Sequence, residues 1–393
     1  MLSEKTKAII KQTVPILEQS GVELTKLFYK KMLGENPFLL NIFNKKNQET
    51  GDQPTALAKS VLAAAKNIDD LSKIIPVVKQ IGYKHKALQI KADHYPIVGK
   101  YLILAIDELL HPGKEVLDAW TAAYQVIADV FISVEKEMYD NELWHGWQPF
   151  KVIRKTKINE KGDFYEFIVK NEEVLTNTQL IKPGEYITVR VKPKGELNYA
   201  LRHYSICGVE GLHNGELKFA IKLLDKNGKK GLVSHYLIDE IQLGDTLDIS
   251  APSGGDFSLN TDLISQNKYP IIFISAGSGI TPLIFMLETQ VKLNKNRKVI
   301  WIQSNQYKID QPFKEKVEEL LSYNSENKNI QIFTQEGDHR IDLDFLKFNV
   351  PADGDVYVCG GLEFMKDILG YLAHLQIVRV RHEAFGPQIS LLK

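Results

Sequence analysis

Cysteine is almost missing from this sequence: among 393 residues only Cys207 and Cys359 occur, far apart along the chain. Two cysteines cannot build a disulfide framework, and an iron–sulfur cluster held by cysteines needs more of them than one chain offers here. Both kinds of site are therefore excluded within a single chain. A reducing cytoplasm is the simplest setting for such a protein.

Net charge and long apolar runs are also lacking. The 49 basic residues balance the 49 acidic ones, which gives no sign of nucleic acid or an anionic membrane as a partner. The apolar run YLILAI at 101–106 ends at Asp107, far short of the roughly 18 residues of a spanning helix. The N-terminal MLSEKTKAII mixes charges and does not resemble a signal peptide. We expect a cytoplasmic protein without membrane insertion.

Helical patterns fill residues 1–147 almost throughout. Amphipathic stretches cover roughly 4–19, 22–33, 54–66 and 98–110. A last helix is predicted because apolar residues recur at steps of three and four, namely Leu117, Trp120, Tyr124, Ile127, Phe131, Val134 and Met138. The first part of the chain is predicted to be an all-α domain.

The pattern changes after Trp144–Pro149. Short β-rich runs separated by Gly and Pro turns predict an antiparallel barrel or sandwich over 148–262, with strands at 152–158, 164–170, 186–191 and 217–224. From 263 to 393 strands alternate with helical stretches, which is typical of a parallel α/β sheet, and these strands lie at 269–275, 298–303, 330–333 and 355–359. The expected fold is multidomain: all-α, then antiparallel β, then α/β.

One histidine of the helical part stands out. In IGYKHKAL, His85 ends a short helical segment that precedes another apolar helix, so its imidazole can project into a pocket between helices. A neutral imidazole is a good iron ligand. A lone histidine is nevertheless more often structural, and an all-α domain of this length could be a plain helical bundle. A cofactor must therefore be argued from further residues.

Further residues of this part resemble the globin domain of flavohaemoglobins, and the match spans 1–147. They are Tyr29 in LTKLFYKKM, Asp52–Gln53 after Gly51, Lys84–His85, Tyr95 in HYPIVG, Glu135 in FISVEKEMY and the run NPFLLNIFN at 36–44. The resemblance implies a haem b whose iron is bound by His85, with Tyr29 and Gln53 on the distal side and Lys84 in the same site. It also implies a relay from Tyr95 and Glu135 to His85, in which a carboxylate raises the basicity of the imidazole.

Each of these residues has a plainer interpretation when taken alone. Tyr29 on an apolar helix face would usually belong to the core. Glu135 could be a surface residue that pairs with lysine, and Tyr95 could pack at a helix start. Only the full set at this spacing favours the haem site.

A flavin site is indicated by three matches in the expected order. The segment RHYS at 202–205 resembles the R-x-Y-S signature of ferredoxin-reductase-like flavoproteins, PGEY at 183–186 resembles their P-G-Q-Y turn, and KKGLVSHYL at 229–237 occupies the place of their second phosphate-binding segment. An arginine there can bind the flavin diphosphate, although Arg202 could instead form a surface ion pair. Tyr204 would pack against the isoalloxazine and Ser205 would bond near its N5. The residues predicted to bind FAD are Tyr186, Arg202, His203, Tyr204, Ser205, Gly231, Val233 and Ser234.

A nicotinamide site is indicated by GSGITP at 277–282, directly after a buried strand. The glycines let the backbone approach a diphosphate, Thr281 can cap the next helix, and Pro282 suits its first turn. CGG at 359–361 resembles the nicotinamide-side C-G-P element, and EAFGP at 383–387 resembles the E-C-F-G-P tail whose aromatic covers the flavin. The predicted residues are Gly277, Ser278, Gly279, Ile280, Thr281, Pro282, Cys359, Gly360, Ala384, Phe385, Gly386 and Pro387. Phe385 could also be a core aromatic.

Three residues depart from the family pattern: Glu185 replaces Gln, Gly361 replaces Pro and Ala384 replaces Cys. None removes a group that the chemistry requires, although Glu185 adds a negative charge near an anionic cofactor. The segment WIQSNQYK at 301–308 has neither an acidic ribose clamp nor a pair of arginines for a phosphate. These residues therefore leave the choice between NADH and NADPH open, and the family resemblance favours NADH.

The resemblance implies an all-α globin domain, an antiparallel β-barrel FAD domain and an α/β parallel-sheet NAD(P)-binding domain of the ferredoxin-reductase kind. It also implies a nitric oxide dioxygenase in which NAD(P)H reduces FAD, FAD reduces the haem, and oxygen bound there converts nitric oxide to nitrate. Three alternatives remain: a reductase of alkyl or lipid hydroperoxides, an oxygen-binding or oxygen-sensing globin kept ferrous by its reductase, and a flavin reductase with a helical docking domain. The expected partners are oxygen, nitric oxide and NAD(P)H, with a lipid in the distal pocket left open. Neither nucleic acid nor an obligatory protein partner is expected.

Overall fold

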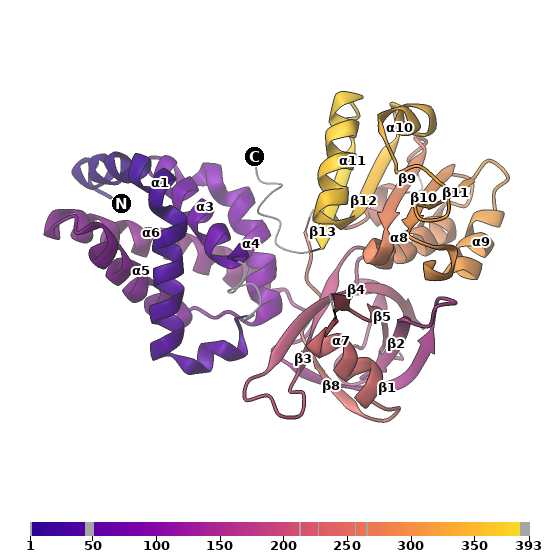
Figure 1. Ribbon diagram of the computed structural model, residues 1–393, viewed down its shortest axis with the longest axis horizontal. Helices are drawn as coiled ribbons and strands as arrows, with labels where there is room; N and C mark the ends of the chain where they lie inside the picture. Colours follow the sequence, from indigo (N-terminus) through magenta and orange to yellow (C-terminus); the bar gives the residue numbers. More distant parts are fainter. Residues whose placement is uncertain are drawn as a thin grey trace. The chain divides into compact units, whose positions relative to one another are not determined.

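The computed structural model describes residues 2–43, 51–211, 214–226, 228–255, 257–264 and 266–385. The chain divides into two compact units. Residues 1–146 and the segment 190–201 form the first unit, and residues 147–189 with the chain that follows Leu201 form the second. Figure 1 colours these elements along the sequence, with the helical part in indigo and purple.

Over its described residues, the first unit is a bundle of α-helices with two short 3-10 helices. Its elements are α1 (Glu4–Glu35), η1 (Pro37–Asn41), α3 (Asp52–Lys66), η2 (Leu71–Ile74), α4 (Ile75–Leu88), α5 (His94–Leu110) and α6 (Lys114–Asp140). The apolar stripe predicted for the last helix lies on α6, where Trp120 and Ala123 are buried in a core shared with α1 and α5. The prediction of an all-α first part is confirmed.

The prediction of two separate helices at 4–19 and 22–33 is wrong, because α1 runs through both stretches without a break. Gly21 lies inside this helix, where a glycine usually costs about 1 kcal/mol. Packing against α3 outweighs that cost: a Cβ at Gly21 would lie 3.5 Å from the Ala58 Cβ, and the Thr25 hydroxyl donates to the Pro54 carbonyl at 2.8 Å. Tertiary contacts of this kind decide where helices end more strongly than local propensity does.

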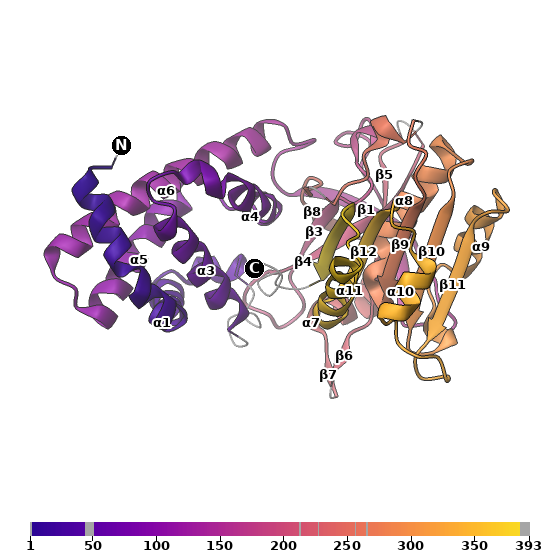
Figure 2. The same cartoon turned by 90° about the horizontal axis from the view of Figure 1, so that it is seen from above.

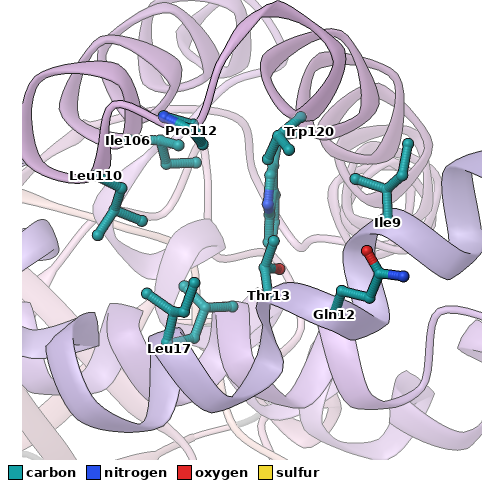
Figure 3. A pocket seen from close by; sticks show the side chains of 10 residues that line it. Ile9, Gln12, Thr13, Leu17, Ile106, Leu110, Pro112 and Trp120 are labelled. Atoms are coloured by element: carbon teal, nitrogen blue, oxygen red, sulfur yellow. The ribbon is translucent and has the colours of Figure 1, made fainter.

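An apolar cavity of about 330 Å³ lies between α1, α5 and α6. Figure 3 shows Leu17 of α1, Ile106 and Leu110 of α5, and Trp120 of α6 around the same space. The lining residues are Ile9, Gln12, Thr13, Ile16, Leu17, Ile106, Leu110, Pro112, Val116 and Trp120. None of the residues predicted for the haem site is among them, so this cavity is distinct from that site.

The β-rich part closes into a six-stranded antiparallel barrel, so a barrel and not a sandwich is observed (Figure 1). Its strands follow the order β1-β2-β5-β4-β3-β8 around the barrel. They are β1 (Gln148–Lys157), β2 (Phe164–Lys170), β3 (Tyr186–Val191), β4 (Ala200–Glu210), β5 (Glu216–Lys222) and β8 (Thr246–Ile249). The connections carry η3 (Thr178–Leu180), β6 (Asp225–Lys226), β7 (Lys229–Lys230), α7 (Leu232–His235), η4 (Tyr236–Glu240) and η5 (Thr261–Leu263).

The last part is a five-stranded parallel sheet of order β11-β10-β9-β12-β13, with helices on both faces (Figure 2). Its strands are β9 (Ile271–Ala276), β10 (Val299–Asn305), β11 (Lys328–Phe333), β12 (Asp355–Gly361) and β13 (Val380–Phe385). Its helices are η6 (Gly277–Gly279), α8 (Ile280–Leu293), η7 (Lys308–Asp310), α9 (Lys314–Ser322), α10 (Leu343–Asn349) and α11 (Leu362–His374). The strand order reverses between β9 and β12, and ligands of such sheets bind at the carboxyl ends of the strands at this point.

The opposite, amino-terminal end of this sheet is held by a buried ion pair between Arg297 and Asp355. The same guanidinium donates to the Tyr269 carbonyl at 2.7 Å and to the Gln290 side chain at 3.0 Å. Burial lowers the pKa of Arg297, and the carboxylate of Asp355 opposes this shift. Each of the three guanidinium nitrogens thus has an acceptor, and such pairing is the condition under which a buried charge is tolerated.

Replacing Arg297 by Met should destabilise the parallel sheet by about 3 kcal/mol, because the Asp355 carboxylate would lose its main counter-charge while staying buried. Native-state hydrogen exchange of β9 and β12 amides in the full chain measures this loss locally. The matched control is Lys366→Met, since Lys366 pairs with Glu363 on the exposed side of α11. Equal effects of about 0.5 kcal/mol or less in both variants would contradict the prediction.

Candidate functional site

His85 lies in the last turn of α4, where its imidazole meets a buried carboxylate. The His85 Nδ1 lies 2.6 Å from the Glu135 Oε1, and the Tyr95 hydroxyl donates to the same oxygen at 2.6 Å. The Tyr95 oxygen lies 3.3 Å from the His85 Nδ1. The three residues come from α4, α5 and α6, and the structure brings together the relay that the sequence predicts.

The packing around this relay fixes the imidazole. Glu135 is only 3% exposed, and a Cβ at Gly82 would lie 3.0 Å from the Met138 Sδ, so α4 and α6 approach closely at this glycine. Burial and the neighbouring Glu135 carboxylate raise the pKa of Tyr95, so its hydroxyl keeps the proton that it donates. A carboxylate that accepts from Nδ1 leaves Nε2 as the ring nitrogen for a ligand.

Tyr29 and Gln53 form a second polar pair in the helical unit. Tyr29 is buried on α1 with the rings of Phe28 and Phe43 at centroid distances of 4.8 and 5.7 Å. Burial raises the pKa of Tyr29, and a hydrogen bond from the Gln53 side chain on α3 offsets part of that shift. The structure therefore joins the two residues predicted for the distal side. Lys84, beside His85 on α4, is half-buried.

The donor set fits a haem better than an iron held by protein side chains alone. Among the described residues, no three His, Cys, Asp or Glu side chains gather where they could hold a metal. A haem needs only one imidazole because the porphyrin supplies four nitrogens. The His85 side chain is 31% exposed, and in the described ranges its hydrogen bonds engage Nδ1 alone.

In the barrel, β4 carries the R-x-Y-S residues, and alternation along a strand places Arg202 and Tyr204 on one face. Burial lowers the pKa of Arg202 and raises that of Tyr204, whose ring lies 5.5 Å from the Phe219 ring. His203 lies on the other face, where its Nδ1 is 2.8 Å from the Thr188 hydroxyl and its ring is 5.1 Å from that of Tyr186. Ser205 on that face is buried.

Two turns beside β4 explain the residues around it. The Glu185 carboxylate accepts the Lys182 N–H at 2.8 Å and so closes the P-G-E-Y turn, a bond that the side-chain oxygen of Gln could also accept. Gly231 has no space for a side chain, because a Cβ there would lie 2.8 Å from the Ser234 Oγ. The Ser234 hydroxyl in turn accepts the Leu224 N–H at 3.2 Å, and Val233 is buried.

The glycine turn after β9 is held against β12. Gly277 has a φ of +52°, and a Cβ there would meet nothing within 4 Å, so this side of the turn is open. A Cβ at Gly279 would lie 2.1 Å from the Cys359 carbonyl oxygen, so only glycine fits. An open turn at a helix N-terminus suits the diphosphate of a dinucleotide.

Thr281 does not cap the helix as predicted. It lies inside the first turn of α8, and its hydroxyl donates to the Ser278 carbonyl at 3.0 Å instead of accepting a backbone N–H. Pro282 lies in the same first turn, as expected, and Ile280 is buried. The missing side-chain cap leaves the N–H groups at the start of α8 to other acceptors.

The C-terminal residues lie beside the glycine turn. Cys359 and Gly360 lie near the end of β12, where they pair with Glu383 and Ala384 of β13, and Ala384 is buried. Phe385 is half-buried against the core that Cys359 belongs to, which fits either a lid or a core aromatic. Gly386 and Pro387 lie outside the described residues.

Three polar side chains at the ends of β9 and β10 were not singled out from the sequence. Ser275 and Gln303 are fully buried and Asn305 is 6% exposed. Within the described chain, the Ser275 Oγ, the Gln303 Nε2 and both polar side-chain atoms of Asn305 lack hydrogen-bond partners. A signal was present in the letters QSN, since polar residues that end a buried strand often face a ligand.

Comparison with known proteins is consistent with this geometry. Family models match in the order Globin at 26–131, Oxidoreductase FAD-binding domain at 149–257 and Oxidoreductase NAD-binding domain at 273–369. The chain is 40% identical to the Flavohemoprotein of Oceanobacillus iheyensis, covering 100% of this chain and 98% of that protein. The Bacillus subtilis Flavohemoprotein is 38% identical over 100% of this chain and 99% of that protein.

The chain belongs to the flavohemoprotein family. The crystal structure of the flavohemoglobin of Malassezia yamatoensis, described with bound FAD and heme, is 26% identical to it. That structure has a TM-score of 0.84 and covers 98% of this chain and 100% of its own. The predicted fold class is confirmed, and haem, FAD and NAD are the cofactors of this flavohemoprotein. None of its helices, over the described ranges, is long and apolar enough for a membrane span.

Removing the shared acceptor of the relay tests how tightly the flavohemoprotein's helices are coupled. Glu135→Ala should cost about 2–3 kcal/mol, because it leaves the buried Tyr95 hydroxyl and the His85 Nδ1 without their acceptor, and Tyr95→Phe should cost about 1 kcal/mol. The double variant should lose less unfolding free energy than the sum of the two single losses, by at least about 0.5 kcal/mol. Urea unfolding of the helical unit within the full chain measures these losses.

Tyr101→Phe provides the matched control for this cycle, since the Tyr101 hydroxyl donates to Glu35 at 2.7 Å and not to Glu135. Its effect should add to that of Glu135→Ala. Strict additivity for Tyr95→Phe as well would show that the relay is not an energetic pair.

Gly279→Ala should destabilise the parallel-sheet part by about 2 kcal/mol or more, because the new methyl group would collide with the Cys359 carbonyl. It should also abolish calorimetric binding of NAD⁺, since the turn must move away from β12. Gly361→Ala is the control, as a Cβ at Gly361 meets nothing within 4 Å and its φ of −71° suits any residue. A Gly279→Ala protein with ordinary stability and binding would contradict the close approach.

Proposed function

We propose that this flavohemoprotein is a nitric oxide dioxygenase that converts nitric oxide and oxygen to nitrate at the expense of NAD(P)H. The single observation that carries the proposal is the buried Glu135 carboxylate on His85 Nδ1 at 2.6 Å, in a chain that also contains FAD- and NAD-binding domains. A globin that only stores oxygen needs neither a charged partner on its proximal imidazole nor a reductase in the same chain. The overall reaction consumes about one NADH for every two nitric oxide molecules.

His85, Glu135 and Tyr95 set the character of the iron site. The Glu135 carboxylate holds the proton of His85 at Nδ1 and raises the basicity of Nε2, which favours oxygen activation over reversible storage. Tyr95 donates to the same carboxylate at 2.6 Å and fixes its orientation. Bound haem would supply the iron at which oxygen and nitric oxide react, and bound FAD would accept a hydride and release electrons singly.

Tyr29 and Gln53 supply hydrogen bonds on the distal side in this proposal. Because burial raises the pKa of Tyr29, its phenol stays protonated at physiological pH and can donate to an oxygen that gains negative charge. Gln53 holds the phenol through its side-chain bond. Lys84 is placed in the same site by its position next to His85.

The reductase part would bind its two cofactors at β4 and at the glycine turn. Arg202 would bind the FAD diphosphate, Tyr204 would pack on the isoalloxazine and Ser205 would bond near N5. Further FAD contacts are proposed for Tyr186, His203, Gly231, Val233 and Ser234. The nicotinamide coenzyme would lie on Gly277, Ser278, Gly279, Ile280, Thr281, Pro282, Cys359 and Gly360, with Ala384, Phe385, Gly386 and Pro387 beside the flavin.

The decisive experiment follows nitric oxide with an electrode in air, with and without NADH, and measures nitrate in the same samples. Wild-type protein should remove nitric oxide only with NADH and yield matching nitrate. His85→Ala should lose this activity while it keeps its flavin absorption and still reduces ferricyanide with NADH, because its reductase part is unchanged.

Other outcomes would point elsewhere. Persistent nitric oxide in a protein with both Soret and flavin bands would overturn the dioxygenase. NADH oxidation driven by an alkyl hydroperoxide would then favour the hydroperoxide reductase, which the same proximal carboxylate also suits. A stable oxygen complex with little NADH consumption would favour an oxygen-binding globin.

A further inference from the structure

We propose that Lys155 is a positioning residue for FAD, because its ammonium group holds the far end of the helical segment whose first residues would bind the cofactor's phosphates. The inference rests on the FAD contacts proposed above for Gly231, Val233 and Ser234. It adds a residue that lies outside every cofactor site predicted from the sequence. Lys155 itself makes no contact with FAD in this proposal.

The segment in question is a continuous run of helical residues. α7 passes directly into η4, so the run extends from Leu232 to Glu240. No side chain caps its start at Gly231, which leaves the N–H groups of its first turn to other acceptors. Its second half is π-helical, a geometry that is rare and often found near functional sites. Leu237 and Ile238 are buried, so the segment is packed and not loose on the surface.

Lys155 reaches the end of this segment from β1. Its Nζ donates to the Ile238 carbonyl and, at 3.0 Å, to the Ile241 carbonyl just beyond the last turn. The last carbonyls of a helix have no partner within it, and they form the negative end of its dipole. One ammonium group therefore satisfies two of these carbonyls and also places a positive charge where the dipole favours it.

The barrel wall fixes the ammonium group in this place. The Lys155 Nζ lies 5.6 Å from the ring centroid of Phe167 and 5.9 Å from that of Tyr165, and both rings belong to β2. Burial lowers the pKa of Lys155, and the Asp239 carboxylate offsets part of this shift. The cost of desolvating the amine is thus met by the two carbonyls and the two rings, which together tie β1 and β2 to the helical segment.

Other contacts hold the start of the segment. The Gly231 N–H donates to the Leu224 carbonyl at 2.6 Å, and the Leu224 N–H donates to the Ser234 hydroxyl at 3.2 Å. These bonds join the start to the chain that precedes it, whereas Lys155 joins the end to the barrel. Since a binding site needs support behind the residues that touch the ligand, loss of the Lys155 bonds should displace the N–H groups that face the phosphates.

The test measures flavin binding to the flavin-free full-length chain by fluorescence titration. The probes are FAD and riboflavin, which has the isoalloxazine ring but no phosphate. Lys155→Met removes the charge and both hydrogen bonds but keeps the length of the side chain. FAD binding should weaken about tenfold or more, and riboflavin binding should change by less than about threefold. Lys155→Arg can still donate to both carbonyls, so its FAD affinity should stay within about threefold of wild type.

Hydrogen exchange of the Leu232, Val233 and Ser234 amides reports the position of the segment directly. FAD should slow their exchange in wild type, because phosphate oxygens accept these N–H groups, and Lys155→Met should lose most of this protection. Exchange of the Phe219 amide in β5 should stay unchanged, which separates displacement of the segment from unfolding of the barrel. If Lys155→Met does not fold, Lys155→Gln takes its place, since its shorter side chain cannot reach both carbonyls.

Lys157→Met is the matched control. Lys157 lies two residues further along β1 and is exposed, so neither FAD nor riboflavin affinity should change.

Four results would overturn the proposal. They are an unchanged FAD affinity in Lys155→Met, an equal loss for FAD and riboflavin, the same loss in Lys157→Met, and a Lys155→Arg variant that binds FAD no better than Lys155→Met. If FAD fails to protect residues 232–234 in wild type, the FAD contacts proposed above fail and the role of Lys155 fails with them. None of these assays involves nitric oxide or the reduction of haem, so their outcome is independent of whether the dioxygenase proposal holds.

Discussion

The helical unit depends on one buried carboxylate. Glu135 of α6 is almost fully enclosed and accepts hydrogen bonds from α4 and α5 at the same oxygen. An isolated buried charge would cost several kcal/mol, so this arrangement persists only because both donors are fixed by their own helices. Tyr124 contributes to that fixation, since its hydroxyl donates to the Tyr95 carbonyl at 2.6 Å. The contact between Glu135 and His85, the proposed iron ligand, therefore also helps to position α4, α5 and α6 against one another.

In the second unit, one close contact at the glycine turn likewise has two consequences. The same close approach that excludes a side chain at Gly279 brings the end of β9 against Cys359 of β12, at the point where the strand order reverses. The opposite end of the sheet is fastened by Arg297 and Asp355, so the two ends differ in kind. At one end the buried Arg297 has acceptors for its guanidinium nitrogens, and at the other Ser275, Gln303 and Asn305 have side-chain atoms without hydrogen-bond partners among the described residues. Ligand sites in such sheets occur at the second kind of end.

Much of this architecture could be predicted from the sequence because its signals are local. The stripe on α6, the strands β2 and β3, and the turn after β9 all follow from periodicity and glycine placement within a few residues. The prediction of the relay to His85 depended on the family resemblance. No local pattern in the sequence shows that the Tyr95 hydroxyl lies 2.6 Å from the Glu135 Oε1. The residues implied for the two cofactor sites remain predictions.

What could not be predicted depended on contacts between distant segments. The stretches 4–19 and 22–33 were predicted separately, but α1 continues through Gly21, which packs against Ala58. Thr281 was predicted to cap α8, but its hydroxyl donates to the Ser278 carbonyl. The β-rich runs were equally compatible with a sandwich, because closure depends on β1 pairing with β8, which is about a hundred residues away. The letters QSN at the end of β10 carried only a weak signal for Asn305, because the lack of hydrogen-bond partners for its side chain is seen only in the structure.

The positions of the two cysteines in the fold bear on how readily their thiols react. Cys207 and Cys359 are fully buried, and burial raises the pKa of each well above its ordinary value. Only the thiolate is an effective nucleophile towards oxidants and nitrosating species. At neutral pH both thiols of the folded chain therefore stay protonated and shielded from solvent, so neither offers a thiolate to an oxidant.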